Sequence, residues 1–279
     1  MASRCIQQRA RRIRINKSTI LNITSQNLRS LSTTNNKKRE ELFHKFSKQQ
    51  HDVALLQETH NHRTTGHEDI VNRDNELLLS HSAAKKSGGV GFILNRRARE
   101  AWSAAGEVVS YHEIDGVTRI GAIHLQYKTG RITTRFYIVN IYFPATSSGH
   151  DNNKSASENK QKSDELFDQM ESLLAEVIKK CPSSSTLIIG GDINARVGNC
   201  DDWDDKGITG KFGIPGTNER GVSLASLLYN FNLKAISTYF QKRSYATYRT
   251  KKGTLVPPPG GHMNTFFYQN IRLQMHTRY

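Results

Sequence analysis

The order of apolar and polar residues along the chain predicts short buried strands with a few amphipathic helices between them. The run 134–143 (TRFYIVNIYF), rich in aromatic and β-branched residues, gives the strongest strand signal. Other apolar runs are too short for helices and also predict strands. These runs are 18–24, 53–57, 76–81, 88–94, 118–127 and 186–190, and an aromatic stretch follows at 264–268.

Apolar residues at helical spacing predict helices over 37–49, about 163–180 and 219–231. Polar or glycine-rich composition predicts loops over 146–163 and 198–218. Because several strands follow one another directly, the pattern favours an α/β or α+β sandwich of sheets over a regular βαβ repeat.

Length and composition narrow the class of protein. The 279 residues suit one large domain or two small ones, and 36% hydrophobic residues with a mean hydropathy of −0.62 exclude a membrane-embedded chain. Three cysteines are too few and too scattered for a disulfide framework or a zinc site. A reducing compartment is therefore expected.

The charge is concentrated at the two ends of the chain. The formal net charge is +15, yet ten basic residues and no acid precede Glu40, and nine basic residues and no acid follow Glu219. The middle is slightly acidic. Arg-rich ends can lie along a nucleic-acid backbone, and the alternative is a solvated tail.

The basic stretch 1–17 bears on localisation. It lacks the apolar core of a secretory signal, so we expect an intracellular protein, nuclear or cytoplasmic. A mitochondrial presequence is the alternative, because the stretch is rich in Arg and free of acid.

Polar side chains sit where several of the predicted buried strands end, and at such points a rigid scaffold presents groups for chemistry. They are Asn27, Glu58, Tyr142, Asp192 and Asn194. A carboxylate such as Glu58 suits a hard cation such as Mg²⁺. Asp192 and Asn194 fall on one side if the segment is extended, so that one accepts a proton from water and the other donates hydrogen bonds.

Each of these residues also has an ordinary structural interpretation. Asn27 can be a turn residue, Glu58 a solvated carboxylate, and Tyr142 a core residue with a satisfied hydroxyl. Asp192 and Asn194 after two glycines can form a simple turn. Their occurrence in order, each after a strand, favours a shared site.

Four motifs carry a resemblance to a known family. Ser25-Gln26-Asn27, Leu56-Gln57-Glu58-Thr59, Asn140–Ala145 (NIYFPA) and Gly190–Ala195 (GGDINA) look like the endonuclease/exonuclease/phosphatase superfamily, which is DNase I-like. The segment after Asp192, with its Trp and repeated glycines, resembles non-LTR (LINE-type) retrotransposon endonuclease domains and the craniofacial development protein family. The resemblance covers about residues 18–270, between tails 1–17 and 271–279.

The resemblance implies a four-layered α/β sandwich that hydrolyses phosphodiesters, most simply of DNA, with Mg²⁺ or Mn²⁺. It implies that Glu58 and Asn27 hold the metal and that Asp192 positions or deprotonates the attacking water. Asn194 and Tyr142 would hold the phosphate. In such chemistry positioning and charge neutralisation matter more than covalent steps.

The C-terminal part departs from the family pattern. The family ends with an Asp-bearing strand and a Ser-Asp-His motif, whereas this chain has Asn264 near the first position and no acid after Glu219. His276 has no Asp beside it. We therefore expect a truncated or diverged copy that lacks the last strand of the sandwich.

Three functions stay open at this point. One is an Mg²⁺-dependent DNA endonuclease of the retroelement type. Another is a catalytically impaired relative that binds nucleic acid or a protein partner without turnover. The third retains the fold and acts on a different phosphodiester, such as an RNA tail, an inositol phosphate or a lipid.

Overall fold

The structure of the protein is a computed structural model. It describes residues 21–31, 36–60, 67–72, 74, 76–82, 88–143, 155–198, 206–212, 216–240 and 264–268; for Asn36 and the last range only the backbone is described. The expected tails 1–17 and 271–279 lie outside these residues.

The first sheet contains five strands in the order β1-β2-β5-β4-β3. They are β1 (Ile23–Asn27), β2 (Val53–Gln57), β3 (His67–Val71), β4 (Leu78–Ser82) and β5 (Val90–Leu94). β1 and β2 run parallel and in register, with Asn27 opposite Gln57. The segment Ser25-Gln26-Asn27 and the residue before Glu58 therefore reach the same end of the sheet.

The second sheet contains six strands in the order β10-β11-β9-β8-β7-β6. They are β6 (Val109–Ile114), β7 (Val117–Thr129), β8 (Ile132–Tyr142), β9 (Thr186–Asp192), β10 (Lys234–Ala235) and β11 (Asn264–Tyr268). β8 and β9 are parallel, and their last residues, Tyr142 and Asp192, lie opposite one another. Parallel strands need a long crossover, which here includes a helix.

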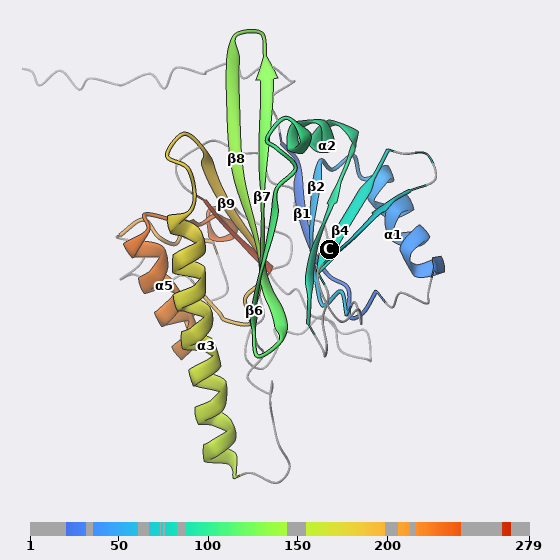
Figure 1. Ribbon diagram of the computed structural model, residues 1–279. Coiled ribbons are helices and arrows are strands. Elements are labelled where there is room, and N and C mark those ends of the chain that lie inside the picture. The colour runs from blue at the N-terminus through green and yellow to red at the C-terminus, as the bar shows by residue number, and fades with distance from the viewer. Residues whose placement is uncertain are drawn as a thin grey trace, which may run out of the picture.

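Helices cover the outer faces of both sheets, which gives the four layers visible in Figure 1. The helices are α1 (Asn36–Lys48), α2 (Arg96–Ser103), α3 (Ala156–Lys179) and α5 (Glu219–Asn230), with a 3₁₀ turn η2 (Ile236–Thr238). α1 packs on the first sheet, while α3 and α5 pack on the second. The expected four-layered α/β sandwich is thus confirmed.

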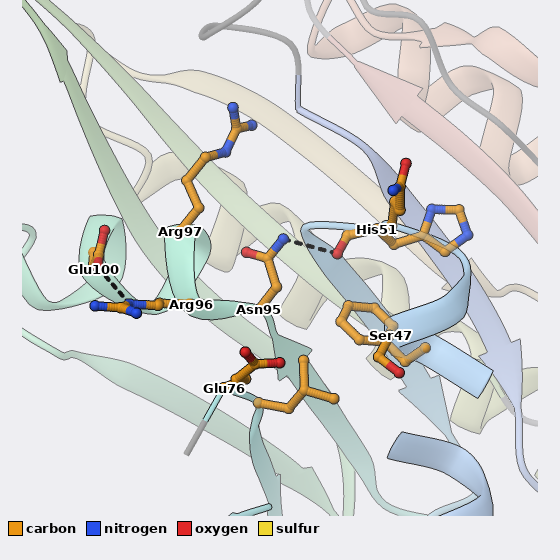
Figure 2. Close-up of a pocket in the computed structure, with 10 residues that line it drawn as sticks. Ser47, His51, Glu76, Asn95, Arg96, Arg97 and Glu100 are labelled. Atoms are coloured by element: carbon orange, nitrogen blue, oxygen red, sulfur yellow. Dashed lines mark hydrogen bonds and ion pairs between the residues drawn. The ribbon is translucent and has the colours of Figure 1, made fainter. Parts of the chain in front are cut away.

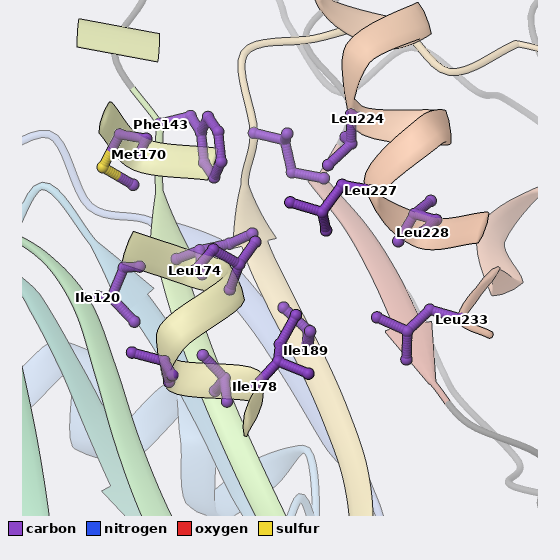
Figure 3. Packing of buried hydrophobic residues seen from close by; sticks show 14 of the residues in the cluster. Ile120, Phe143, Met170, Leu174, Ile178, Ile189, Leu224, Leu227, Leu228 and Leu233 are labelled. Carbon is purple, nitrogen blue, oxygen red and sulfur yellow. The ribbon is translucent and has the colours of Figure 1, made fainter. Parts of the chain in front are cut away.

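The continuous apolar runs of the strands follow from this layering. On β2, Leu55 faces the layer between the sheets and Leu56 faces α1; on β9, Ile188 faces the inner layer and Ile189 faces α3 and α5. Figure 3 shows the outer cluster of the second sheet, where Leu174 of α3 lies near Ile189. Strands buried on both faces need no alternation with polar residues.

The first strand differs from the sequence-based expectation. We predicted 18–24, with Ser25-Gln26-Asn27 ending it, whereas β1 spans Ile23–Asn27 and residues 18–20 lie outside the described part. Polar residues continue the strand because parallel pairing with β2 holds their backbone, and the Ser25 hydroxyl also donates to Gln57 Oε1 at 3.2 Å.

The expected loop over 146–163 is wrong at its end, because α3 begins at Ala156. The Ser155 side chain accepts from the Glu158 backbone, and the Glu158 side chain accepts in return from the Ser155 backbone. This capping box starts the helix in a polar segment that carries no apolar stripe.

Several elements were not predicted at all. The helix α2 and the strands β3 and β6 have partly exposed or polar sequences whose patterns are weak. The aromatic stretch 264–268 forms β11, which pairs with β9 so that the Asn264 backbone lies opposite Asp192. Within the described residues β1 is an edge of the first sheet. The expected absence of a last strand stays a prediction.

Candidate active site

Glu58 is held at the end of β2 by a strained turn. Its backbone has φ +52°, in the left-handed region that a residue with a side chain seldom adopts. Flanking hydrogen bonds fix this turn, because Ser30 N donates to the Glu58 carbonyl and Thr59 N donates to the Gly89 carbonyl. The carboxylate is therefore placed by backbone contacts on both sides.

The amide of Asn27 connects two carboxylates. Its Nδ2 donates to Glu58 Oε1 at 2.7 Å and to Asp192 Oδ2 at 3.1 Å, while its Oδ1 accepts from Arg29 N. Asn27 and Asp192 are 165 residues apart in sequence and lie on different sheets. The fold thus brings three of the predicted residues together.

Tyr142 belongs to the same cluster. Its hydroxyl donates to Glu58 Oε1 at 3.0 Å. Burial, and then the negative charge of Glu58, raise the pKa of the Tyr142 phenol above its ordinary value. The phenol consequently stays a hydrogen-bond donor at neutral pH.

Asp192 and Asn194 join the ends of β8 and β9. Asn194 Nδ2 donates to the Phe143 carbonyl at 2.7 Å, and Phe143 N donates to the Asp192 carbonyl at 2.9 Å. The segment is not extended as we expected, because Asn194 has φ +49°. In this conformation the Asn194 amide orients the end of β8.

The second of the two glycines before Asp192, Gly191, is required by the approach of two strands. A Cβ at Gly191 would lie 1.9 Å from the Ile141 carbonyl oxygen, and its φ is +149°. Only glycine permits this close approach of β9 to β8. The approach sets Asp192 beside Tyr142.

A buried polar link crosses between the two sheets directly beneath these residues. Gln57 Nε2 donates to Asn140 Oδ1 at 2.7 Å, and Asn140 Nδ2 donates to the carbonyls of Leu56 and Gly91. Both side chains have no solvent exposure. Because Gln57 precedes Glu58 and Asn140 lies two residues before Tyr142, the link fixes one half of the site against the other.

Two residues near the cluster were missed in the sequence. The guanidinium of Arg119 on β7 lies over the Tyr142 ring, 5.1 Å from its centroid, and His60 Nε2 lies 3.9 Å from Glu58 Oε2. The signal for Arg119 was a lone charge inside the apolar run TRIGAI. A histidine two residues after a candidate ligand was a weaker signal.

The donor set suits a hard divalent cation. Glu58 and Asp192 offer carboxylate oxygens that share one amide donor, and Mg²⁺ typically binds one or two protein carboxylates while keeping its waters. Among the described residues, no group of three or more His, Cys, Asp or Glu is placed so that it could hold a metal ion. The specific metal is left open by this chemistry.

A pocket at the opposite end of β2 has a different character. Its volume is about 460 Å³, and Figure 2 shows Asn95 joined to the His51 carbonyl and Arg96 to Glu100. Arg97, which also lines it, forms an ion pair with Asp52 at 3.0 Å. None of the predicted site residues lines this pocket.

Comparison with known proteins supports the fold. No family model and no curated protein sequence matches the chain. Among solved structures, an AP endonuclease from Leishmania major is 14% identical, with a TM-score of 0.56, over 88% of this chain and 77% of that one. An AP endonuclease from Archaeoglobus fulgidus is 15% identical, with a TM-score of 0.51, over 88% and 85%.

A third similar structure is the endonuclease domain of TRAS1, a telomere-specific non-LTR retrotransposon, at 15% identity and a TM-score of 0.41, over 88% of this chain and 83% of that one. The likeness to the two AP endonuclease structures establishes the fold, which is DNase I-like. In the part of the chain that the structure describes, no helix has the length and apolar character to cross a membrane.

Proposed function

We propose that this chain, with its DNase I-like fold, is a metal-dependent phosphodiesterase of the retrotransposon endonuclease type, acting on DNA. The observation that carries the proposal is the convergence on Glu58. Asn27 and Tyr142 both donate to its Oε1, and Asn27 also reaches Asp192. Side chains from both sheets thus form one cluster of carboxylates and donors.

The roles proposed for these residues follow from their positions. Glu58 would bind the cation, with Asn27 completing its surroundings, and a bound Mg²⁺ or Mn²⁺ would supply Lewis-acid stabilisation of phosphate charge. Asp192 would orient or deprotonate the attacking water. Tyr142 and Asn194 would hold the phosphate, although Asn194 at present donates to the Phe143 carbonyl.

The order of motifs supports the finer assignment to non-LTR retrotransposon endonucleases. Ser25-Gln26-Asn27, the QET segment at 57–59, the NIYFPA segment and GGDINA occur in sequence order, and their site residues now lie at one end of the two sheets. DNA is the proposed substrate because this motif set is the one that such endonucleases share. The two basic ends of the chain agree with a polyanionic partner.

The alternative is a related binder with impaired catalysis. The specific observation in its favour is that Asn264, whose backbone pairs with Asp192, stands near the position where the resemblance places an Asp. Loss of a single charge-stabilising group costs about 10²–10³ in rate in comparable hydrolytic sites. Such a protein would bind DNA with little turnover.

Nicking of supercoiled plasmid tests the proposal. We expect purified protein to nick the plasmid with Mg²⁺, and we expect EDTA or Asp192→Ala to abolish nicking. The matched control is Asp168→Ala, which removes an exposed carboxylate on α3 and should nick at the wild-type rate.

The result contradicting hydrolysis is an absence of metal-dependent nicking by folded protein. Salt-dependent DNA binding by that protein would then favour the alternative. The same assay can include an RNA, an inositol phosphate or a lipid phosphodiester as a competitor. If one of them competes more strongly than DNA does, that compound class replaces DNA as the proposed substrate.

A further inference from the structure

Arg119 is a buried cation beside the proposed catalytic cluster. Only 7% of its surface is exposed, and its Nε atom is buried without a hydrogen bond among the described residues. No ion pair of Arg119 with an acidic group lies within 4 Å in that part of the chain. Burying a guanidinium without a direct counter-ion lowers the stability of the folded protein, so a buried arginine of this kind points to a functional role.

A bulge in the second sheet sets the direction of the Arg119 side chain. Thr118 pairs with Glu113 and Ile120 pairs with His112, so Arg119 is the extra residue where the register of β6 and β7 shifts. Bulges of this kind redirect a side chain and are frequent next to active sites. On the other side of β7, Ile120 pairs with Ile141, which places Arg119 next to Tyr142 on β8.

Arg119 contacts the cluster through Tyr142. Its guanidinium lies over the Tyr142 ring, and the Tyr142 hydroxyl donates to Glu58 Oε1. Burial lowers the pKa of Arg119, while Tyr142, Asp115 and Glu58 act in the opposite direction and favour its charged form. Arg119 keeps its charge at neutral pH because its ordinary pKa is far above 7.

The charges of the site show what Arg119 contributes. Glu58 and Asp192 carry two negative charges, and Arg119 cancels one of them. With a divalent cation bound, the site is left with one positive charge, which matches one phosphodiester group. Without Arg119 the cation-bound site would be neutral and would attract a phosphodiester less strongly.

We propose that Arg119 is a positioning and charge-setting residue of the phosphodiester site, which fixes the Tyr142 ring and weakens cation binding in exchange for phosphate binding. This inference rests on the proposed function. It predicts that loss of the Arg119 charge strengthens binding of the cation and weakens binding of the phosphodiester. A purely structural arginine would lower the affinity for both.

The test measures two affinities in Arg119→Met and in wild type. Mn²⁺ binding is followed by electron paramagnetic resonance, and binding of a fluorescent DNA oligonucleotide is followed by anisotropy in Ca²⁺, both at pH 8. We expect Arg119→Met to bind Mn²⁺ about fivefold to tenfold more tightly and the oligonucleotide about threefold to tenfold more weakly.

Two further variants separate charge from structure. Arg119→Lys retains the charge, and we expect it to keep Mn²⁺ affinity within about twofold of wild type. Arg135→Met removes an exposed arginine from the far end of β8 and should leave Mn²⁺ affinity unchanged. If Arg119→Met does not fold, as judged by circular dichroism and thermal melting, Arg119→Gln replaces it.

The outcomes separate the two proposals. Mn²⁺ affinity that is unchanged or weaker in the folded variant without the charge, Arg119→Met or Arg119→Gln, overturns this inference alone, provided that the wild type binds Mn²⁺. A wild type that binds no Mn²⁺ overturns the proposed function and this inference with it.

Discussion

At the scale of single residues, the site depends on backbone positions that tolerate few side chains. Glu58 and Asn194 have positive φ values. Gly191 also has a positive φ, and the Ile141 carbonyl oxygen leaves no room for a Cβ at this position. These conformations persist only because surrounding hydrogen bonds fix them. Substitution at such points should affect folding and site geometry together.

Gly191→Ala should destabilise the protein by about 3 kcal/mol or more, because the new Cβ would overlap the Ile141 carbonyl oxygen. Urea denaturation followed by tryptophan fluorescence measures the change. Gly130→Ala is the matched control, since it also has a positive φ but no atom within 4 Å of its Cβ, and about 1 kcal/mol is expected. Equal losses in both variants would contradict the role of close strand approach.

Asn140→Leu should cost about 3 kcal/mol of unfolding free energy. The change leaves Gln57 Nε2 and the carbonyls of Leu56 and Gly91 buried without their partner. The double variant Gln57→Leu with Asn140→Leu removes both side chains, and a loss smaller than the sum of the single losses is expected. Strict additivity in the same denaturation assay would argue against a coupled link.

The sequence reveals some of these residues and conceals others. Asn27, Glu58, Tyr142 and Asp192 could be predicted because each stands at the end of a strand. Arg119 could not be predicted, because a charged residue within an apolar run gives no indication of the layer that its side chain enters. The bulge that directs this side chain arises only when β7 pairs with β6.

At the scale of elements, α3 shows how solvent-facing turns can hide a helix from pattern analysis. Its first two turns are mainly polar and exposed, and its apolar stripe begins only near Phe167. The helix start is fixed locally by the capping box, whereas the stripe is fixed by packing on the second sheet. The sequence predicted the packed part and missed the capped part.

Ser155→Ala should lower the unfolding free energy by about 1 kcal/mol, because the backbone of Glu158 loses its acceptor. Thermal melting compares it with Ser172→Ala, which changes an exposed serine further along α3. A loss in the Ser172 variant as large as in the Ser155 variant would refute this assignment.

Burial, with a smaller contribution from Asp168, raises the pKa of Glu171 on α3 to about 7. The folded state therefore holds this proton more tightly than the unfolded state, whose pKa is 4.5. Stability should fall as the pH rises from 4.5 to 7, by about 2 kcal/mol after allowance for partial exposure. Glu171→Gln should remove this fall.

Urea denaturation at pH 5 and pH 8 checks the Glu171 prediction. Glu165→Gln, an exposed position on the same helix, is the control and should keep the wild-type pH dependence. A Glu171 variant that is no more stable than wild type at pH 8 would contradict it.

At the scale of the whole molecule, the excess of positive charge and most of the candidate active site lie in different parts of the sequence. The slightly acidic middle of the chain, between Glu40 and Glu219, supplies most strands of both sheets and every residue of the cluster except Asn27, whereas the two ends carry basic residues and no acid. If the ends contact DNA phosphates, they contribute affinity that depends strongly on salt.

Replacing Arg9, Arg11, Arg12 and Arg14 by Gln should make DNA binding less dependent on salt. The slope of log K against log[salt] should decrease in magnitude by about 2 to 4, because counterions are released only by cations at phosphates. Anisotropy titrations between 50 and 300 mM KCl, over which the Debye length falls roughly 2.5-fold, measure this slope. An unchanged slope would identify residues 1–17 as a solvated tail.

The division of the site between two sheets has a consequence for its thermal behaviour. Asn27 and Glu58 extend from one sheet and Tyr142 and Asp192 from the other, with the Gln57–Asn140 link between them. Loosening of the inner layer would separate the two halves while each sheet kept its own ladder of hydrogen bonds. On heating, cation affinity should therefore disappear before the far-ultraviolet dichroism of the strands changes.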